Sequence, residues 1–97
     1  MSTNTIHDLA EVLRETRKLL ARPDNQFVWS HWNSAEDALR EIDKFIAQVE
    51  SGETTRRADL ELLFAPTGSI QEVSISSGWG EEFLALSERF DAVLKRA

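Results

Sequence analysis

ADLELLFAPTGSIQEVSIS, residues 58–76, is the stretch on which the predicted fold class depends. Apolar side chains alternate with polar or acidic ones on both sides of a short segment that contains Pro66 and Gly68. The alternating apolar positions are Leu60, Leu62 and Phe64 before this segment and Val73 and Ile75 after it. A period of two is typical of a strand with one buried face, and proline followed by glycine is typical of a turn. The stretch therefore predicts a hairpin of two strands.

A further strand is predicted at residues 26–32, QFVWSHW, because aromatic and β-branched residues are concentrated there and an asparagine and a serine follow. In a strand, Phe27 and Trp29 would point to one face and Trp32 to the other. Large rings on both faces mean that a helix of this chain, or another chain, has to cover the second face of the sheet.

Three stretches have apolar residues at helical spacing. They cover about residues 6–21, 35–51 and 81–95. Pro23 disfavours helical geometry in the residue before it and so ends the first stretch. The second follows the N-cap candidates Asn33 and Ser34 and runs up to Gly52, a residue type that favours the end of a helix.

The predicted order is helix, strand, helix, strand, strand, helix, which belongs to the α+β class. The connection between the first two strands contains a helix and is long enough for a right-handed crossover, so these strands would run parallel. The expected fold is a two-layer α/β sandwich: a three-stranded mixed sheet with the hairpin, and helices packed on its apolar face. Residues 1–97 should form a single domain, because this length is close to the commonest domain size.

Composition excludes several classes of function. The chain carries a formal charge of −6, which repels a phosphate backbone, so we expect no nucleic-acid partner. It has no cysteine and therefore no disulfide, thiol nucleophile or cysteine-ligated metal. The polar N-terminal residues do not resemble a signal peptide and no apolar run is long enough to cross a bilayer, so we expect a soluble cytoplasmic protein without a membrane partner.

The sequence contains no recognisable catalytic, metal or cofactor pattern. His7 and His31 occur in no metal-binding spacing, and no serine lies in a G-x-S-x-G motif. Residues 76–82, SSGWGEE, lack a phosphate-binding lysine and place Glu81 and Glu82 where a phosphate would bind. We expect no catalytic residue, no metal and no cofactor, and the sequence favours a non-enzyme.

The leading functional hypothesis is a small acidic accessory domain that binds protein without catalysis. A narrow sheet leaves two edges unprotected, and Trp32 and Trp79 are candidate partner-binding residues because tryptophan is enriched in interface hot spots. The expected partner is a second copy of the chain, in a homodimer, or another protein.

The alternative hypothesis is a small-molecule-binding protein or a weak acid–base enzyme. Its pocket would be lined by Trp29, His31 and Trp32, the candidate ligand-binding residues. A carboxylate from the polar face of the sheet would supply the polar group; the candidates are Asp59, Glu61 and Glu72.

Overall fold

The computed structural model of the protein describes residues 3–28, 30–52, 57–65 and 68–95. These ranges form five α-helices: α1 (Thr3–Leu20), α2 (Ala35–Glu50), α3 (Arg57–Leu63), α4 (Ser69–Ser77) and α5 (Gly80–Lys95). They contain no strand, so the predicted α+β class and its three-stranded sheet are wrong. None of these helices combines the length and the hydropathy needed to traverse a lipid bilayer.

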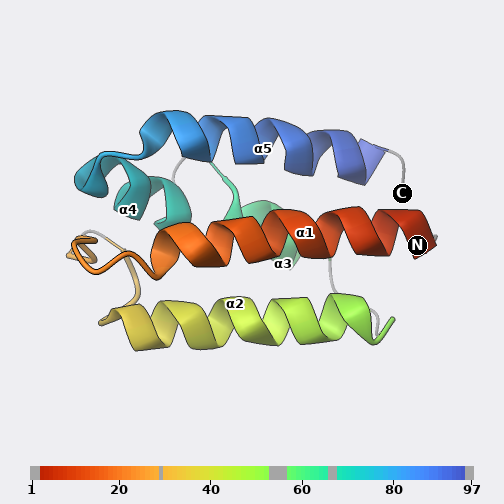
Figure 1. The fold of residues 1–97 in the computed structure, drawn as a ribbon, viewed down its shortest axis with the longest axis horizontal. Coiled ribbons are helices and arrows are strands. Elements are labelled where there is room, and N and C mark those ends of the chain that lie inside the picture. The colour runs from red at the N-terminus through yellow and green to blue at the C-terminus, as the bar shows by residue number, and fades with distance from the viewer. Residues whose placement is uncertain (1–2, 29, 53–56, 66–67, 96–97) are drawn as a thin grey trace.

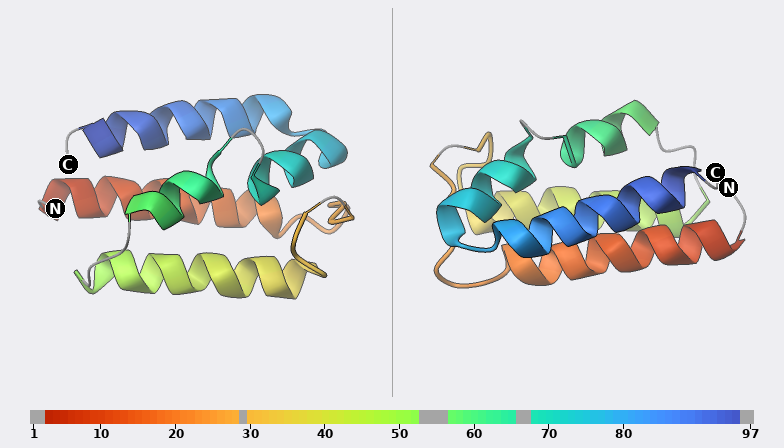
Figure 2. Two further views of the ribbon diagram at one scale, coloured as in Figure 1. Left: turned by 180° about the vertical axis from the view of Figure 1, so that it is seen from behind. Right: turned by 90° about the horizontal axis from the view of Figure 1, so that it is seen from above.

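The three long helices form one layer of the fold (Figure 1). Helix α1 lies in the middle, contacts both α2 and α5, and runs antiparallel to them. The short helices α3 and α4 lie on one side of this layer (Figure 2). Buried apolar side chains from all five helices meet between the two layers, so the short helices complete the core that the long ones begin.

Helix α3 is attached to α5 by aromatic stacking. Phe64, directly after α3, places its ring centroid 4.2 Å from that of Phe90 and 6.5 Å from that of Phe83, with nearly parallel planes. Offset parallel rings at such distances add to the stabilisation that burial already provides. This contact fixes one side of α3 and leaves its other side facing α2.

In the first half of the predicted hairpin, the spacing of the buried residues is that of a helix and not that of a strand. Leu60, Leu63 and Phe64 are buried, a spacing of three and four residues as on one face of a helix. Leu62 is 68% exposed, whereas a strand would have placed it on the buried face with Leu60 and Phe64. Because Leu63 is apolar too, residues 58–64 fit both periods, and their contacts with the rest of the chain select the helix.

The second half of the predicted hairpin is wrong for the same reason. Ile70, Val73 and Ser74 are buried at helical spacing, and Ile75 is 63% exposed although a strand would have buried it beside Val73. Gly78 ends α4 with φ of 85°, a left-handed conformation that glycine adopts without steric cost.

The predicted first strand, residues 26–32, is part of an irregular connection between α1 and α2; residue 29 lies outside the described ranges. Its polar side chains bond to nearby backbone and stabilise turns. The Nδ2 of Asn25 donates to the last two carbonyls of α1, and Ser30 Oγ donates to the carbonyl of Phe27 at 2.9 Å. Such local bonds offer the backbone an alternative to a strand ladder.

The three predicted helices are confirmed as α1, α2 and α5, each within a few residues of its expected bounds. Ser34 is the N-cap of α2, and its hydroxyl accepts a bond from the backbone N–H of Asp37 at 3.3 Å. After the helix, Gly52 has φ of 75°, as expected for a residue that ends a helix.

Ion pairs connect α1 to both of its neighbours. The pairs are Arg14–Glu50 and Arg17–Asp43 toward α2 and Glu15–Arg89 toward α5, and Arg22, two residues after α1, pairs with Glu82 of α5. In the second pair Nε of Arg17 lies 2.6 Å from Oδ1 of Asp43, and this hydrogen bond lowers the pKa of the Asp43 carboxyl. All four pairs are solvent-exposed, so each stabilises the layer only slightly.

Candidate functional site

Three of the predicted site residues, Trp29, His31 and Trp32, belong to the connection between α1 and α2. Trp32 is 5% exposed, and its Nε1 donates to Oε2 of Glu41 on α2 at 2.7 Å. The ring therefore packs on the core while its polar edge reaches α2. Trp29, predicted to line a ligand pocket, lies outside the described residues.

Trp79, at the start of α5, is completely buried. Its Nε1 donates to Oδ1 of Asn25 at 2.9 Å, and the amide nitrogen of the same asparagine donates to the carbonyls of Leu19 and Leu20. Trp79 thus joins the start of α5 to the end of α1. Trp32 and Trp79 are both covered by their own chain, and the hypothesis that they contact a partner stays a prediction.

His31 is the predicted site residue that remains at the surface, with 64% of its side chain exposed. Its Nδ1 bonds to Oγ of Ser69, the first residue of α4, and its Nε2 lies 3.3 Å from Oε2 of Glu41. The backbone N–H of His31 also donates to Ser69 Oγ at 3.2 Å. His31 therefore connects α4 with α2 across the end of the fold.

The carboxylate of Glu41 can only accept a hydrogen bond, so a neutral His31 ring bonded to it carries its hydrogen on Nε2. In that tautomer Nδ1 is an acceptor, and the Ser69 hydroxyl is its donor. Hydroxyl, imidazole and carboxylate in this order can activate a nucleophile. Here Ser69 also accepts a backbone bond and Glu41 also accepts the Trp32 indole bond, so each has a structural role in attaching the connection.

A groove of about 670 Å³ lies between α2, α3 and the start of α4, and His31 and Ser69 belong to its lining. Phe45 of α2 and Leu62 and Leu63 of α3 give it apolar surface. Leu63 is buried, but Leu62 is the most exposed large apolar side chain of the described helices. Phe64, directly after α3, stacks on Phe90 of α5, and the groove lies between α3 and α2.

The lining of the groove has more negative than positive groups. Among the described residues that line it, the carboxylates are Glu41, Asp59 and Glu72, and the permanent cation is Lys44. Glu41 bonds to Trp32 and His31 as described above. Asp59 and Glu72 form no ion pair with any other residue that the structure describes. Three carboxylates against one ammonium give the groove a net negative charge.

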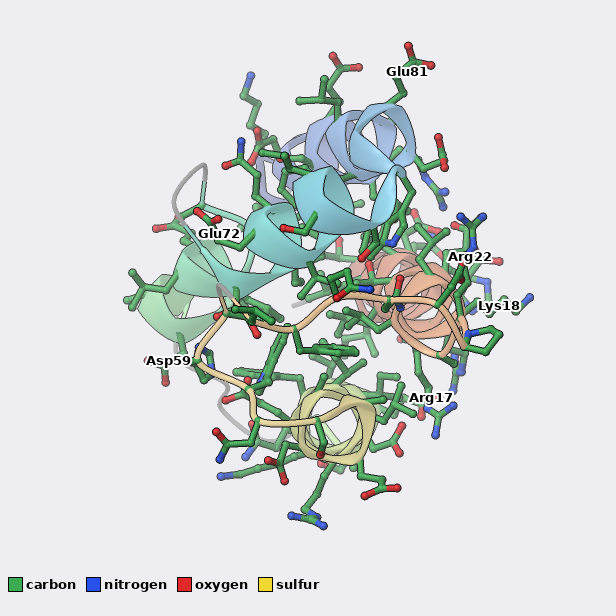
Figure 3. The ribbon with its side chains drawn as sticks, turned by 90° about the vertical axis from the view of Figure 1, so that its left-hand side faces the viewer. Arg17, Lys18, Arg22, Asp59, Glu72 and Glu81 are labelled. Atoms are coloured by element: carbon green, nitrogen blue, oxygen red, sulfur yellow. The ribbon has the colours of Figure 1, made fainter. Side chains whose placement is uncertain are left out.

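Basic side chains gather on a different side of the molecule. In Figure 3, Asp59 and Glu72 lie on one side, while Arg17, Lys18 and Arg22, at the end of α1, lie on the opposite side. The two groove carboxylates therefore lie on the other side of the molecule from these three basic residues, of which Arg17 and Arg22 are paired with Asp43 and Glu82.

A second hollow, about 350 Å³ between α1 and α5, provides a contrast. It is lined by the acidic Glu15 and Glu82 and by the basic Lys18 and Arg89. Its charges are balanced two against two, and Arg89 is paired with Glu15. This hollow offers no field that would select a charged partner, so the acidic groove is the better candidate site.

The sequence placed Asp59, Glu61 and Glu72 on the polar face of a sheet, and that sheet is absent from the described residues. Asp59 and Glu72 belong instead to helices α3 and α4 and line the groove. Sequence reasoning did not connect His31 with Ser69 or Glu41, which are 38 and 10 residues away in the chain. No local pattern marks such pairs, because only tertiary packing brings them together.

His7, Asp8 and Glu11, on the first turns of α1, have potential ligand atoms within 4.8 Å of one another. All three belong to one helix surface, and His7 and Glu11 are exposed. Exposed acidic clusters of this kind are common without an ion, so the spacing alone assigns no metal site.

Comparison with known proteins assigns no function. No protein-family model, no curated protein and no solved structure matches this chain.

Proposed function

We propose that this protein is a non-catalytic interaction module that binds another protein through the groove between α2, α3 and α4. The observation that carries the proposal is the position of Leu62. This side chain is exposed on the lining of a concave surface that also contains Asp59 and Glu72, two carboxylates that have no ion-pair partner among the described residues.

Single exposed leucines are common on protein surfaces and need no explanation by themselves. Leu62 differs because it shares a groove with Phe45 and Leu63, so one apolar side chain of a partner would contact all three. Burying a leucine side chain stabilises a complex by about 1.5–3 kcal/mol. The unpaired carboxylates beside it would select the charge of that partner.

A different protein is favoured over a second copy of this chain. The sheet edges that motivated self-association do not exist in the described residues. Two copies with a charge of −6 each repel one another over the distance that salt does not screen. A homodimer therefore becomes an alternative outcome of the test.

The test compares two leucines of similar exposure. Leu62→Ser removes the apolar contact of the groove, and Leu84→Ser, on the exposed side of α5, removes a leucine that is 59% exposed. Each variant and the unaltered protein are immobilised and incubated with lysate of the source organism, and retained proteins are quantified by mass spectrometry. We expect a partner that the unaltered protein and Leu84→Ser retain and Leu62→Ser loses.

Sedimentation at micromolar concentration completes the test. A monomer with a groove-dependent partner supports the proposal. A dimer that dissociates in Leu62→Ser would replace it with self-association. Retention that is equal for Leu62→Ser and Leu84→Ser would show that the groove binds nothing specific.

A second candidate function is a weak acid–base or hydrolytic site, favoured by the bonds among Ser69, His31 and Glu41. Ser69 Oγ would bond to the carbonyl carbon of an ester while Nδ1 of His31 accepts the hydroxyl proton, and the ring would return this proton to the departing alkoxide. Water would then release the acid from Ser69, and Glu41 would orient the ring throughout. The first backbone N–H groups of α4 have no acceptor within the helix and would stabilise the oxyanion.

A fluorophosphonate probe separates the two candidates. The second candidate requires labelling of Ser69 that is abolished in Ser69→Ala and strongly reduced in His31→Gln. The interaction module requires none, because in it Ser69 and His31 attach the connection between α1 and α2 to α4.

A further inference from the structure

We infer that the groove receives a basic amphipathic segment of its partner, with an apolar side chain against Leu62 and lysine or arginine side chains toward Asp59 and Glu72. This inference rests on the proposed function and specifies the chemistry of the partner. It follows from how charge is distributed between the two walls of the groove.

The wall formed by α3 and α4 carries the negative charge. Asp59 projects from α3 and Glu72 from α4, and both point to the same side of the molecule (Figure 3). Neither has an ion-pair partner among the residues described. Each would gain a charge-assisted hydrogen bond from a cation supplied by another molecule.

The α2 wall differs in charge, because it contains one carboxylate and one ammonium group, those of Glu41 and Lys44. Glu41 already accepts bonds from Trp32 and His31, so its charge is partly engaged. Lys44, three residues further along the same helix, has no ion-pair partner in the described part of the chain. The wall therefore presents an unpaired ammonium group, which disfavours a basic residue in that position.

These two walls orient the occupant. Cationic side chains would face α3 and α4, a neutral or acidic side chain would face Lys44, and the apolar side chain would lie between them beside Leu62. A small cation could contact Asp59 and Glu72 but would leave Leu62 in water. An acidic peptide or a phosphate backbone would meet two unpaired carboxylates and is excluded by like charge.

The probe is a synthetic sixteen-residue peptide with leucine at every third or fourth position and lysine on one flank of the leucine stripe. A matched peptide carries glutamate in place of each lysine. Binding is measured by fluorescence anisotropy, and the contact surface is mapped by amide chemical shifts in ¹H–¹⁵N spectra. We expect the lysine peptide to bind and to shift amides of α3, of the start of α4 and of the facing side of α2.

Three variants test the charge arrangement. The double variant Asp59→Asn with Glu72→Gln should lower the affinity for the lysine peptide about 2- to 30-fold, as expected for the loss of two exposed ion pairs. Glu88→Gln with Asp91→Asn makes the same change in net charge on the exposed surface of α5 and should leave affinity within about twofold. Lys44→Gln should increase the affinity for the lysine peptide about twofold, because it removes a like charge from the groove. Damage to the fold would lower the affinity, so an increase separates the two explanations.

The inference is overturned if the glutamate peptide binds as well as the lysine peptide, or if the α5 control weakens binding as much as the groove variant. Neither result contradicts the proposed function if the unaltered protein retains a partner that Leu62→Ser loses. If the lysine peptide binds at the groove but no partner depends on Leu62, the proposed function fails while the charge preference of the groove is confirmed.

Discussion

The layer of α1, α2 and α5 and the side formed by α3 and α4 differ in how strongly their sequences specify a helix. Each long helix spans at least 16 residues, so several turns repeat the same apolar stripe and only a helix fits it. Helices α3 and α4 span seven and nine residues, too few to distinguish a period of 3.6 from a period of two. In the short elements, contacts with the long helices decide the structure.

The two regions also differ in how they use charge. On the long-helix layer, acidic and basic side chains are paired across the helix contacts. On the α3 and α4 side, Asp59 and Glu72 have no such partners among the described residues. Ion pairs thus contribute to the packing of the first region, whereas the carboxylates of Asp59 and Glu72 make no such contribution within the described residues.

The largest expected effect concerns Trp79, which follows α4 in the chain and joins the start of α5 to the end of α1. Trp79→Ala should lower the free energy of unfolding by about 4 kcal/mol, because it removes a completely buried indole and the bond to Asn25. Trp79→Phe keeps most of the apolar contact but leaves Asn25 without its donor, and should cost about 1–2 kcal/mol. Urea denaturation measures both, and equal losses would show that the hydrogen bond, not burial, dominates at this junction.

The second prediction tests whether α3 is helical. Phe64→Ala should lower the free energy of unfolding by about 3 kcal/mol, because it removes a buried ring that stacks on Phe90. Leu62→Ala should change it by less than about 0.5 kcal/mol, as expected at an exposed position. A strand would bury both side chains on one face, so similar large losses in both variants would contradict the helix.

The third prediction compares two glycines on either side of Trp79. Gly78→Ala should destabilise the protein by about 1 kcal/mol, because φ of 85° is unfavourable for a residue with a Cβ atom. Gly80→Ala should be neutral or stabilise by up to about 1 kcal/mol, since its position is helical and a Cβ atom would meet nothing within 4 Å. Thermal denaturation of the two variants gives the comparison, and the same sign for both would contradict the left-handed end of α4.

The smallest effect concerns an ion pair of the long-helix layer. The pKa of Asp43 is lowered by its hydrogen bond with Arg17, so the pair stabilises the folded state above the ordinary carboxyl pKa and loses this contribution as pH falls through the lowered pKa. Arg17→Gln should raise the pKa of Asp43 measured by NMR titration and remove that part of the acid dependence. An unchanged pKa would mean that the pair does not form in solution.

Sequence reasoning identified the three long helices, the N-cap Ser34 and the helix-ending Gly52, because caps and repeated stripes are local signals. It failed for residues 26–32, where β-branched and aromatic residues suggested a strand and local side-chain bonds stabilise turns instead. The sequence also indicated that Asp59 and Glu72 are polar surface positions, but it did not predict the groove that they line. It predicted that Leu62 is buried, whereas this side chain is exposed in the same groove.

The sequence by itself determined the long helices, to within a few residues at their ends, and the excess of acidic residues, since these depend on composition and on residues close together in the chain. Tertiary structure decided that residues 57–63 and 69–77 are helices, that His31 meets Ser69 and Glu41, and that a groove separates α2 from α3. The physical reason is that a short apolar segment fits more than one backbone period. The surface it packs against then selects the conformation, and with it the side chains that remain exposed.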